Sequence, residues 1–164
     1  MNLPSYRIVN LAQAFGCLLL ITIAVAYFEN SLELEPCYLC MIQRAVIIAI
    51  GMICLLAVVH NPRQFGQRVY SSLSILMVII GIYFSGKQLW LQSLPESQVP
   101  SCGIPVEHLF DIFSITEAIA MLLHGDGNCA EVRWQLMGLS MPGWVMVCFV
   151  GFGIIGIIQF LRKS

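Results

Sequence analysis

Residues 36–59 read PCYLCMIQRAVIIAIGMICLLAVV, a Cys-x-x-Cys pair at the start of a long apolar run. The run at 41–59 has about the length that a helix needs to cross the roughly 30 Å core of a bilayer. On a helix, Cys37, Cys40 and Arg44 share one face, because residues three and four apart are neighbours. Exposed N–H groups and the helix dipole at the N-terminus favour thiolate over thiol. The stretch predicts a membrane helix that carries a redox-active thiol pair at one end.

The rest of the chain repeats this apolar pattern. Of its 164 residues, 59% are hydrophobic and 10% are charged, well below the roughly 25% charged that is usual in soluble domains. Membrane helices are expected at about 11–28, 41–59, 69–91 and 143–161, joined by outer loops at 29–40 and 92–142 and a cytoplasmic loop at 60–68. The fold class that follows is all-α, a single integral membrane domain over 1–164 built as a four-helix bundle.

Charge predicts the orientation of this bundle. Five basic residues without a neighbouring carboxylate flank one end of the runs: Arg7, Arg63, Arg68, Arg162 and Lys163. All nine carboxylates fall in the connections at the other end. By the positive-inside rule, both termini and the 60–68 loop are cytoplasmic. The sequence has no basic patch of the kind that would indicate nucleic-acid binding.

The long outer loop is expected to contain short helices. Apolar residues recur at helical spacing between Val106 and Phe113, and Ser114–Glu117 has the pattern of a capping box. We expect one or two short amphipathic helices here, lying in the membrane surface. A further short helix should run from Cys129 to about Met137 and end at Gly138.

The seven cysteines divide into two groups. Cys17, Cys54 and Cys148 lie inside apolar runs, where small apolar packing is their expected role. Cys37, Cys40, Cys102 and Cys129 map to the outer side, and an even set facing an oxidising compartment is typical of two pairs. The anchored Cys37/Cys40 pair suits a cofactor. The other two, 27 residues apart beside Gly and Pro, suit a disulfide that another protein reaches.

Two thiol pairs on one side of a membrane favour an electron relay. Thiolate attack through a mixed disulfide passes electrons from pair to pair, and a quinone is a lipid-soluble acceptor of two electrons. Arg44 could donate hydrogen bonds to a quinone oxygen and stabilise a Cys40 thiolate, or simply extend to the headgroups. The same four cysteines could instead form a four-thiolate zinc site or two static disulfides, although the wide spacing of Cys102 and Cys129 argues against zinc.

Several motifs resemble one family. They are Pro36-Cys37-x-x-Cys40-x-x-x-Arg44, Trp90-Leu91-Gln92 followed by Pro100-Ser101-Cys102, and Asn128-Cys129-Ala130-Glu131 running through Trp134 to Gly138-Leu139-Ser140-Met141-Pro142. Together they make nearly the whole chain similar to the DsbB family of disulfide-bond formation proteins of the bacterial inner membrane.

The resemblance implies a thiol:quinone oxidoreductase that reoxidises the periplasmic thioredoxin-fold oxidase DsbA and uses ubiquinone or menaquinone. Cys102 would form the mixed disulfide with this partner, and Cys129 would be its mate. Cys37 and Cys40 would pass the electrons on, with Cys40 nearest the quinone and Arg44 at the quinone ring. No metal is implied.

The sequence departs from the family at one place. Some members carry a histidine near the outer end of the third helix, whereas Lys87-Gln88-Leu89 has none. A quinone role for an imidazole there is therefore not expected. A sibling quinone-linked thiol oxidase with a different partner is the alternative within the same enzyme class.

Overall fold

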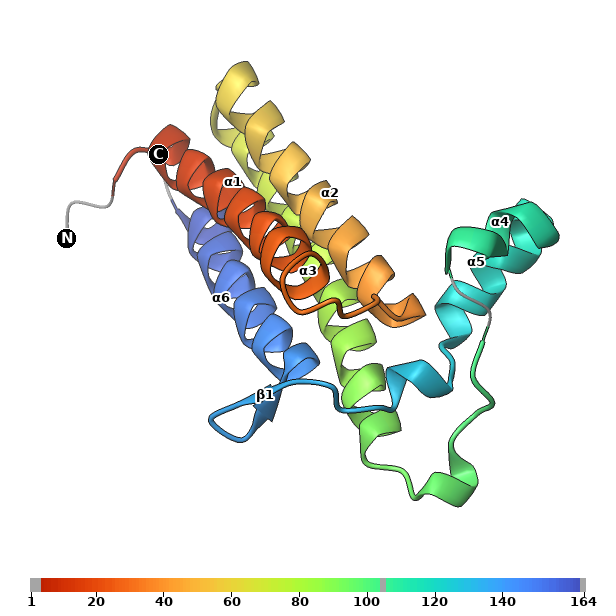
Figure 1. The fold of residues 1–164 in the computed structure, drawn as a ribbon. Coiled ribbons are helices and arrows are strands. Elements are labelled where there is room, and N and C mark those ends of the chain that lie inside the picture. The colour runs from red at the N-terminus through yellow and green to blue at the C-terminus, as the bar shows by residue number, and fades with distance from the viewer. Residues whose placement is uncertain (1–3, 104–105, 163–164) are drawn as a thin grey trace.

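Four long helices form a bundle in the computed structural model, which describes residues 4–103 and 106–162 (Figure 1). They are α1 (Tyr6–Thr22), extended by a π-helical segment η1 (Ile23–Glu29), α2 (Tyr38–His60), α3 (Gln64–Gln92) and α6 (Met141–Leu161). Each contains one predicted apolar run, and all four are long and apolar enough to cross a membrane. The prediction of an all-α membrane four-helix bundle is confirmed.

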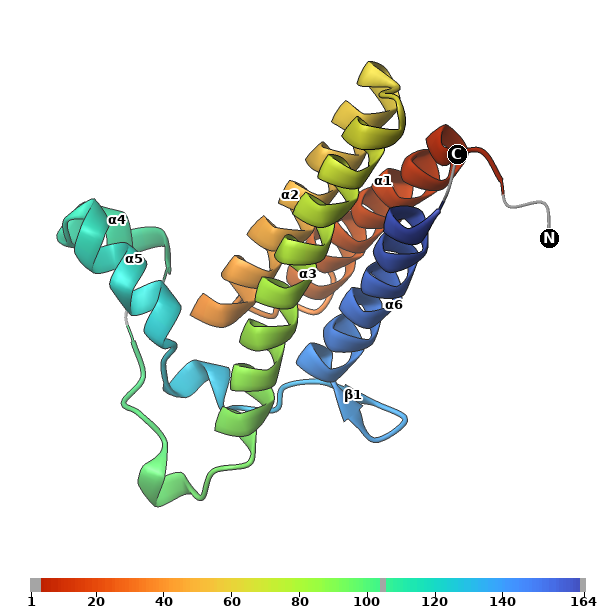
Figure 2. The same cartoon turned by 180° about the vertical axis from the view of Figure 1, so that it is seen from behind.

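The helices pack in the order α1, α2, α3, α6. The start of α1, the α2–α3 turn and the end of α6 lie at one end of the bundle, and the cysteine-bearing loops lie at the other (Figures 1 and 2). At the first end, Asn10 Nδ2 donates to Gln159 Oε1 over 3.0 Å, and Gln159 Nε2 donates to Gln13 Oε1 over 3.1 Å. These buried amides join α1 to α6, as interhelical hydrogen bonds do in membrane bundles. Lys163, one of the basic residues that predict the orientation, lies outside the described residues.

Small residues bring α3 and α6 together, and Gly81 of α3 is the most tightly covered of them. Phe149 of α6 is fully buried, and its ring lies against Gly81 of α3. A Cβ added at Gly81 would come within 2.5 Å of the ring. The absent side chain is what lets the two helices approach, as small residues do at membrane helix interfaces.

Gly81→Ala should therefore lower the free energy of unfolding by about 1–3 kcal/mol, the usual cost of overpacking a core. Titration with SDS in mixed micelles measures this change. Gly151→Ala on α6 is the matched control, because a Cβ there meets nothing within 4 Å. Adding Phe149→Leu should recover part of the loss. Equal stability of the two Gly→Ala variants would contradict the packing argument.

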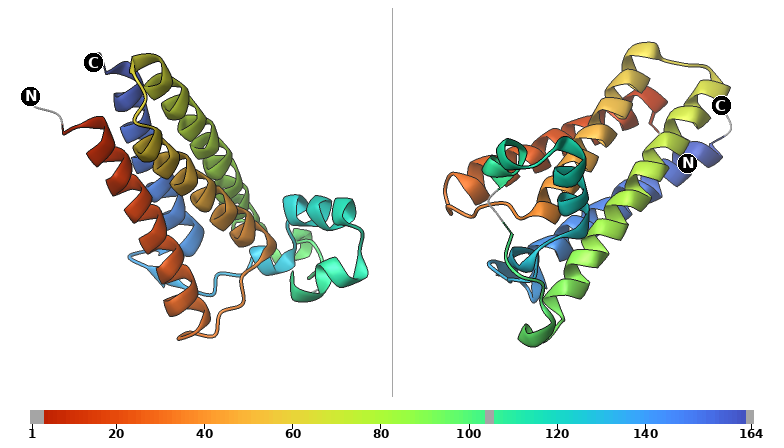
Figure 3. Two further views of the ribbon diagram at one scale, coloured as in Figure 1. Left: turned by 90° about the horizontal axis from the view of Figure 1, so that it is seen from above. Right: turned by 90° about the vertical axis from the view of Figure 1, so that its right-hand side faces the viewer.

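Among its described residues, the outer loop contains two short helices and two single turns of 3₁₀ helix. These are η2 (Glu96–Gln98), α4 (Val106–Ile112), α5 (Ile115–His124) and η3 (Gly127–Cys129). The capping box before α5 forms as predicted. The Ser114 N–H donates to Glu117 Oε2 over 3.2 Å, and the Ser114 hydroxyl donates to the same oxygen over 2.8 Å. The hydroxyl bond first, and then the N–H bond, lower the pKa of the Glu117 carboxyl. Helices α4 and α5 project sideways from the bundle (Figure 3). Their position in the membrane surface stays a prediction.

The prediction of a short helix at 129–137 is wrong. Instead, β1 (Gln135–Leu136) and β2 (Leu139–Ser140) form a two-stranded antiparallel hairpin. Its turn residues Met137 and Gly138 both have positive φ, 52° and 81°, as a tight two-residue hairpin turn requires. Gly138 thus serves as a turn residue rather than as the end of a helix.

Candidate active site

The Cys-x-x-Cys pair lies at the start of α2. Cys37 is the N-cap residue, with extended backbone angles, and Cys40 follows in the first turn. Their sulfurs are 2.8 Å apart, because positions i and i+3 are neighbours on a helix. The two sulfurs are therefore within reach of closing a disulfide with a small side-chain movement.

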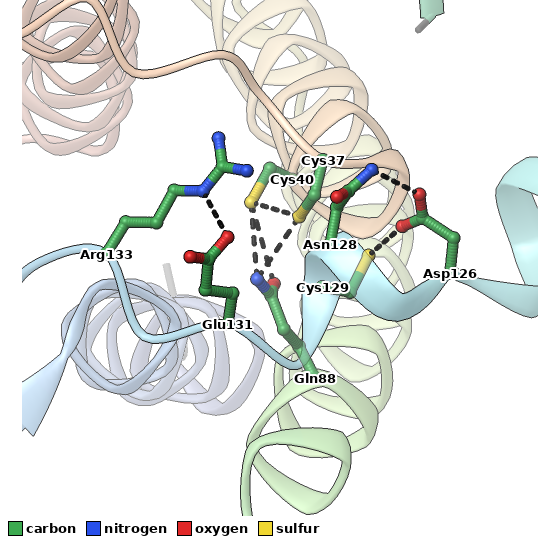
Figure 4. A network of polar contacts seen from close by, with 8 residues as sticks. All are labelled: Cys37, Cys40, Gln88, Asp126, Asn128, Cys129, Glu131 and Arg133. Atoms are coloured by element: carbon green, nitrogen blue, oxygen red, sulfur yellow. Dashed lines mark hydrogen bonds and ion pairs between the residues drawn. The ribbon is translucent and has the colours of Figure 1, made fainter. Parts of the chain in front are cut away.

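A glutamine of α3 holds both sulfurs. Gln88 Nε2 donates to the sulfurs of Cys37 and Cys40, over 3.3 Å in each case (Figure 4). Its Oε1 accepts a hydrogen bond of 2.7 Å from Gln43 Nε2, and both amide side chains are buried. The same oxygen also accepts from the Cys40 thiol over 3.7 Å, so the Gln88 amide contacts Cys40 through both its nitrogen and its oxygen. The site therefore offers N–H donors to charge on either sulfur.

The third thiol of the site comes from η3. Cys129 is fully buried and lies beside Cys37. The pKa of Cys37 is raised, first because of the hydrogen bond with the Cys129 side chain, then because of Cys40 and burial. At Cys37, two neighbouring thiols and burial therefore act against the thiolate that the sequence predicts at the N-terminus of a helix.

Cys102 is the exposed member of the four outer cysteines. Its segment is tied to the Cys129 turn by two hydrogen bonds. The Gly103 N–H donates to the side-chain Oδ2 of Asp126 over 3.1 Å, and the Gly127 N–H donates to the Ser101 carbonyl over 3.2 Å. A Cβ at Gly127 would come within 2.5 Å of a backbone oxygen and 3.3 Å of the Cys102 sulfur. The structure thus brings Cys102 close to the turn that holds Cys129.

Arg44 forms an ion pair with Glu29, the last residue of the π-helical segment, and both side chains are partly buried. This partner differs from those that the sequence predicted, which were the Cys40 sulfur, a quinone oxygen or the headgroups. Arg44 and Cys40 nevertheless line the same cavity. The guanidinium is thus held at the wall that also carries a redox sulfur.

That cavity has a volume of about 280 Å³ and lies between the first span, α2 and α6. Its wall is mainly apolar, with Gln43, Arg44 and Cys40 as polar groups from α2. Phe28 and Trp134 also line it and stack edge to face, with ring centroids 5.1 Å apart. A mainly apolar pocket with a few convergent polar groups is typical of small-molecule sites, and π-helical segments such as the one carrying Phe28 often occur at functional sites.

Sequence reasoning missed several of these residues. Gln43 and Gln88 had a visible signal, because buried amides are uncommon in apolar helices and need partners. Asp126 stands in a Gly-Asp-Gly-Asn stretch that indicated only a turn. Across residues 4–103 and 106–162, no group of three or more His, Cys, Asp or Glu side chains is arranged to hold a metal.

A membrane four-helix bundle with clustered thiols beside an apolar cavity defines a membrane-embedded thiol oxidoreductase. Comparisons with known proteins give the family. The family model described as "Disulfide bond formation protein DsbB" matches residues 6–159. The chain belongs to the DsbB family and is a disulfide-forming oxidoreductase.

Relatives named "Disulfide bond formation protein B" match along most of the chain. The protein from Saccharophagus degradans is 46% identical over 163 residues, covering 99% of this chain and 98% of its own length. Those from Nitrosococcus oceani and Stutzerimonas stutzeri are 42% and 39% identical, covering 92% and 100% of this chain and 88% and 100% of their own lengths.

Proposed function

We propose that the protein oxidises the dithiol of a DsbA-like periplasmic thioredoxin-fold oxidase and passes two electrons to a membrane quinone, ubiquinone or menaquinone. The observation that carries this proposal is the placement of Cys129 against the Cys37/Cys40 pair, which itself borders an apolar cavity. The bundle lies in the bacterial inner membrane with both termini cytoplasmic, as the basic residues around that end suggest.

The partner reacts at Cys102. In the oxidised protein, a thiolate of the partner attacks the sulfur of Cys102 in the Cys102–Cys129 disulfide. The partner–Cys102 bond forms, the Cys102–Cys129 bond breaks, and the electron pair leaves on Cys129. The second thiol of the partner then displaces Cys102. The exposure of Cys102 supports this role, because Cys129 is fully buried.

The electrons then move inward by a second exchange. The thiolate sulfur of Cys129 attacks Cys37 of the Cys37–Cys40 disulfide. The Cys129–Cys37 bond forms, the Cys37–Cys40 bond breaks, and the electron pair leaves on Cys40. Cys102 then attacks Cys129, which restores the Cys102–Cys129 disulfide and leaves the electron pair of the broken bond on Cys37, so that Cys37 and Cys40 together carry the two electrons for the acceptor. Cys37 contacts Cys129 through its side chain, so no large loop movement is needed for the first of these attacks. The Gln88 N–H group donates to the Cys40 sulfur, where the charge arrives.

The acceptor binds in the cavity beside Cys40. A quinone supplies an acceptor for two electrons and two protons. The chemistry of the wall fits its ring: apolar side chains to pack on it, and Arg44 and Gln43 as donors for its oxygens. The volume of about 280 Å³ is near the lower end of the roughly 300–1,000 Å³ usual for small-molecule sites.

The direct test is quinone consumption by the purified protein supplied with a reduced thioredoxin-fold partner. Rapid turnover with oxidation of the partner would support the relay. Absence of turnover, with all four outer cysteines remaining oxidised, would favour two static disulfides. Turnover with a small dithiol but not with a DsbA-like protein would favour a sibling oxidase that has another partner.

Gln88→Leu should slow quinone reduction roughly 10- to 100-fold, because a hydrogen bond to a charged group is worth about 1.5–3 kcal/mol. Stopped-flow measurement of quinone absorbance tests this. Gln92→Leu is the matched control, one turn along α3, since Gln92 Oε1 bonds the Ser140 hydroxyl over 2.7 Å rather than a sulfur. Equal rates in the two variants would show that the Gln88 side chain has no specific role in quinone reduction.

A further inference from the structure

The relay places two opposite requirements on Cys102. Its sulfur must be exposed to the partner in the first exchange, and it must return to Cys129 in the last exchange, which closes the cycle. Cys102 is exposed, whereas Cys129 is fully buried. Residues 101–103 belong to no helix or strand, so regular secondary structure does not hold the Cys102 sulfur near its mate.

Hydrogen bonds fix the chain on both sides of this cysteine. On the N-terminal side, the Ser101 carbonyl accepts from the Gly127 N–H over 3.2 Å. On the C-terminal side, the Gly103 N–H donates to Asp126 Oδ2 over 3.1 Å. Both bonds end in residues 126–129, the turn that carries the buried thiol, so the exposed segment is attached to this turn at two points.

Asp126 is the anchor of the second attachment. It is 4% exposed. Its Oδ2 also accepts from Asn128 Nδ2 over 2.8 Å, and its Oδ1 accepts from the Cys129 thiol over 3.2 Å (Figure 4). Burying a carboxylate is costly unless it is well paired, and this one is paired with groups of the turn and with the Gly103 N–H. It therefore bonds the turn and the exposed segment at the same time.

Two glycines let the exposed segment lie this close to its neighbours. A Cβ added at Gly127 would come within 2.5 Å of the Pro100 carbonyl oxygen and 3.3 Å of the Cys102 sulfur. A Cβ added at Gly103 would come within 2.6 Å of the hydroxyl oxygen of Tyr38, which is itself buried. Neither glycine has a positive φ, so what they provide is space rather than an unusual backbone conformation.

We propose that these contacts form an intramolecular docking site that returns Cys102 to Cys129 for the last exchange. The Cys102 docking site consists of Asp126 and Gly127 of the turn and the ring of Tyr38. This assignment rests on the proposed function. The site fixes the backbone of the segment and leaves the sulfur exposed, which satisfies both requirements of the relay.

The step that depends on the docking site needs no proton transfer. Displacement by the second thiol of the partner releases Cys102 as a thiolate. This thiolate attacks Cys129 of the Cys37–Cys129 disulfide. The Cys102–Cys129 bond forms, the Cys37–Cys129 bond breaks, and the electron pair leaves on Cys37. The docking site holds one sulfur close to another and so raises their effective concentration.

The Cys40→Ala variant isolates this exchange. Without Cys40, the three remaining outer cysteines share a single disulfide, which is either Cys102–Cys129 or Cys37–Cys129. The two forms interconvert by one intramolecular exchange, with no partner and no quinone. Alkylation of the free thiol, followed by mass spectrometry of the peptides, gives their ratio.

Gly127→Ala in this background should shift the ratio roughly 10- to 100-fold towards the disulfide with Cys37, because overpacking against the Pro100 carbonyl pushes the segment off the turn. Gly103→Ala should shift the ratio in the same direction, from the other side of the exposed thiol. Gly151→Ala on α6 is the matched control and should leave the ratio unchanged, because a Cβ there meets nothing within 4 Å.

Two further variants in the same background test the carboxylate. Asp126→Ala removes the acceptor of the Gly103 N–H bond and should shift the ratio about 10-fold or more, as expected for the loss of a hydrogen bond to a charged group. Asp126→Asn keeps a side-chain oxygen that can accept this bond and should recover part of the shift. A residue with a purely structural role would destabilise both disulfide forms alike and leave the ratio unchanged.

The ratios decide the outcome. An unchanged ratio in Gly127→Ala and Gly103→Ala, with both variants folded by circular dichroism, overturns the proposal and leaves the contacts as packing. An equal shift in Gly151→Ala also overturns it, because the ratio would then report general destabilisation. Failure of the proposed function has a different signature, since a wild-type protein that reduces no quinone refutes the relay whatever the ratios are.

Discussion

Cys40→Ala should abolish quinone reduction, by on the order of 1,000-fold or more, as removal of a reacting nucleophile does. Cys40 is the one of the four outer cysteines that lines the 280 Å³ cavity. Its sulfur is also the one on which the relay leaves the electron pair. Without it, the Cys37–Cys40 disulfide cannot form, and the electrons have no route to the acceptor.

The partner reaction should survive in this variant. Cys102 is exposed and belongs to the other thiol pair, so a covalent complex with the partner should still form and be visible on a non-reducing gel. Cys102→Ala should show the opposite pattern, with no covalent complex but with quinone reduction by a small dithiol retained. Cys17→Ala, a change in the buried core, is the control and should keep both reactions. Quinone reduction by Cys40→Ala at the wild-type rate would rule out the relay.

The sequence predicts the bundle well because each long apolar run can satisfy its backbone within lipid only as a helix. It also places four cysteines on one side, since charge and loop length determine which segments lie outside. The contacts among those segments do not follow from such patterns. The approach of Cys129 to Cys37 depends on how the long outer loop folds back, and the hairpin at Gln135–Ser140 depends on a turn that includes a methionine with positive φ.

The contacts of buried polar residues are likewise not predictable from the sequence pattern. Gln88 is visible in the sequence as an amide in a membrane helix, but its contact with both sulfurs requires the packing of α3 against α2. Asp126 is harder to recognise, because its neighbours Gly125 and Gly127 indicate a solvated turn. Its burial comes from the Cys102 segment, which lies against Gly127 and bonds the carboxylate through Gly103.

Arg44 is the residue whose partner in the structure differs most from the partners that the sequence predicts. A lone arginine in a membrane helix is costly, and the sequence predicts the Cys40 sulfur, a quinone oxygen or the lipid headgroups as its partner. The ion pair with Glu29 supplies a partner in the protein itself. Because Glu29 ends the π-helical segment that forms part of the cavity wall, this pair connects the first span to α2 beside the proposed quinone site.

Arg44→Gln should raise the KM for quinone roughly 10- to 100-fold, since it removes a charged donor worth about 1.5–3 kcal/mol, and should leave the exchange of Cys102 with the partner intact. Steady-state quinone kinetics with a fixed partner concentration measure the change. Arg133→Gln is the control, because Arg133 pairs with Glu131 at the surface. Glu29→Gln separates two roles. If Arg44 acts only by neutralising Glu29, the double variant should restore the wild-type KM, whereas a ligand role for Arg44 leaves the KM raised in both Arg44 variants.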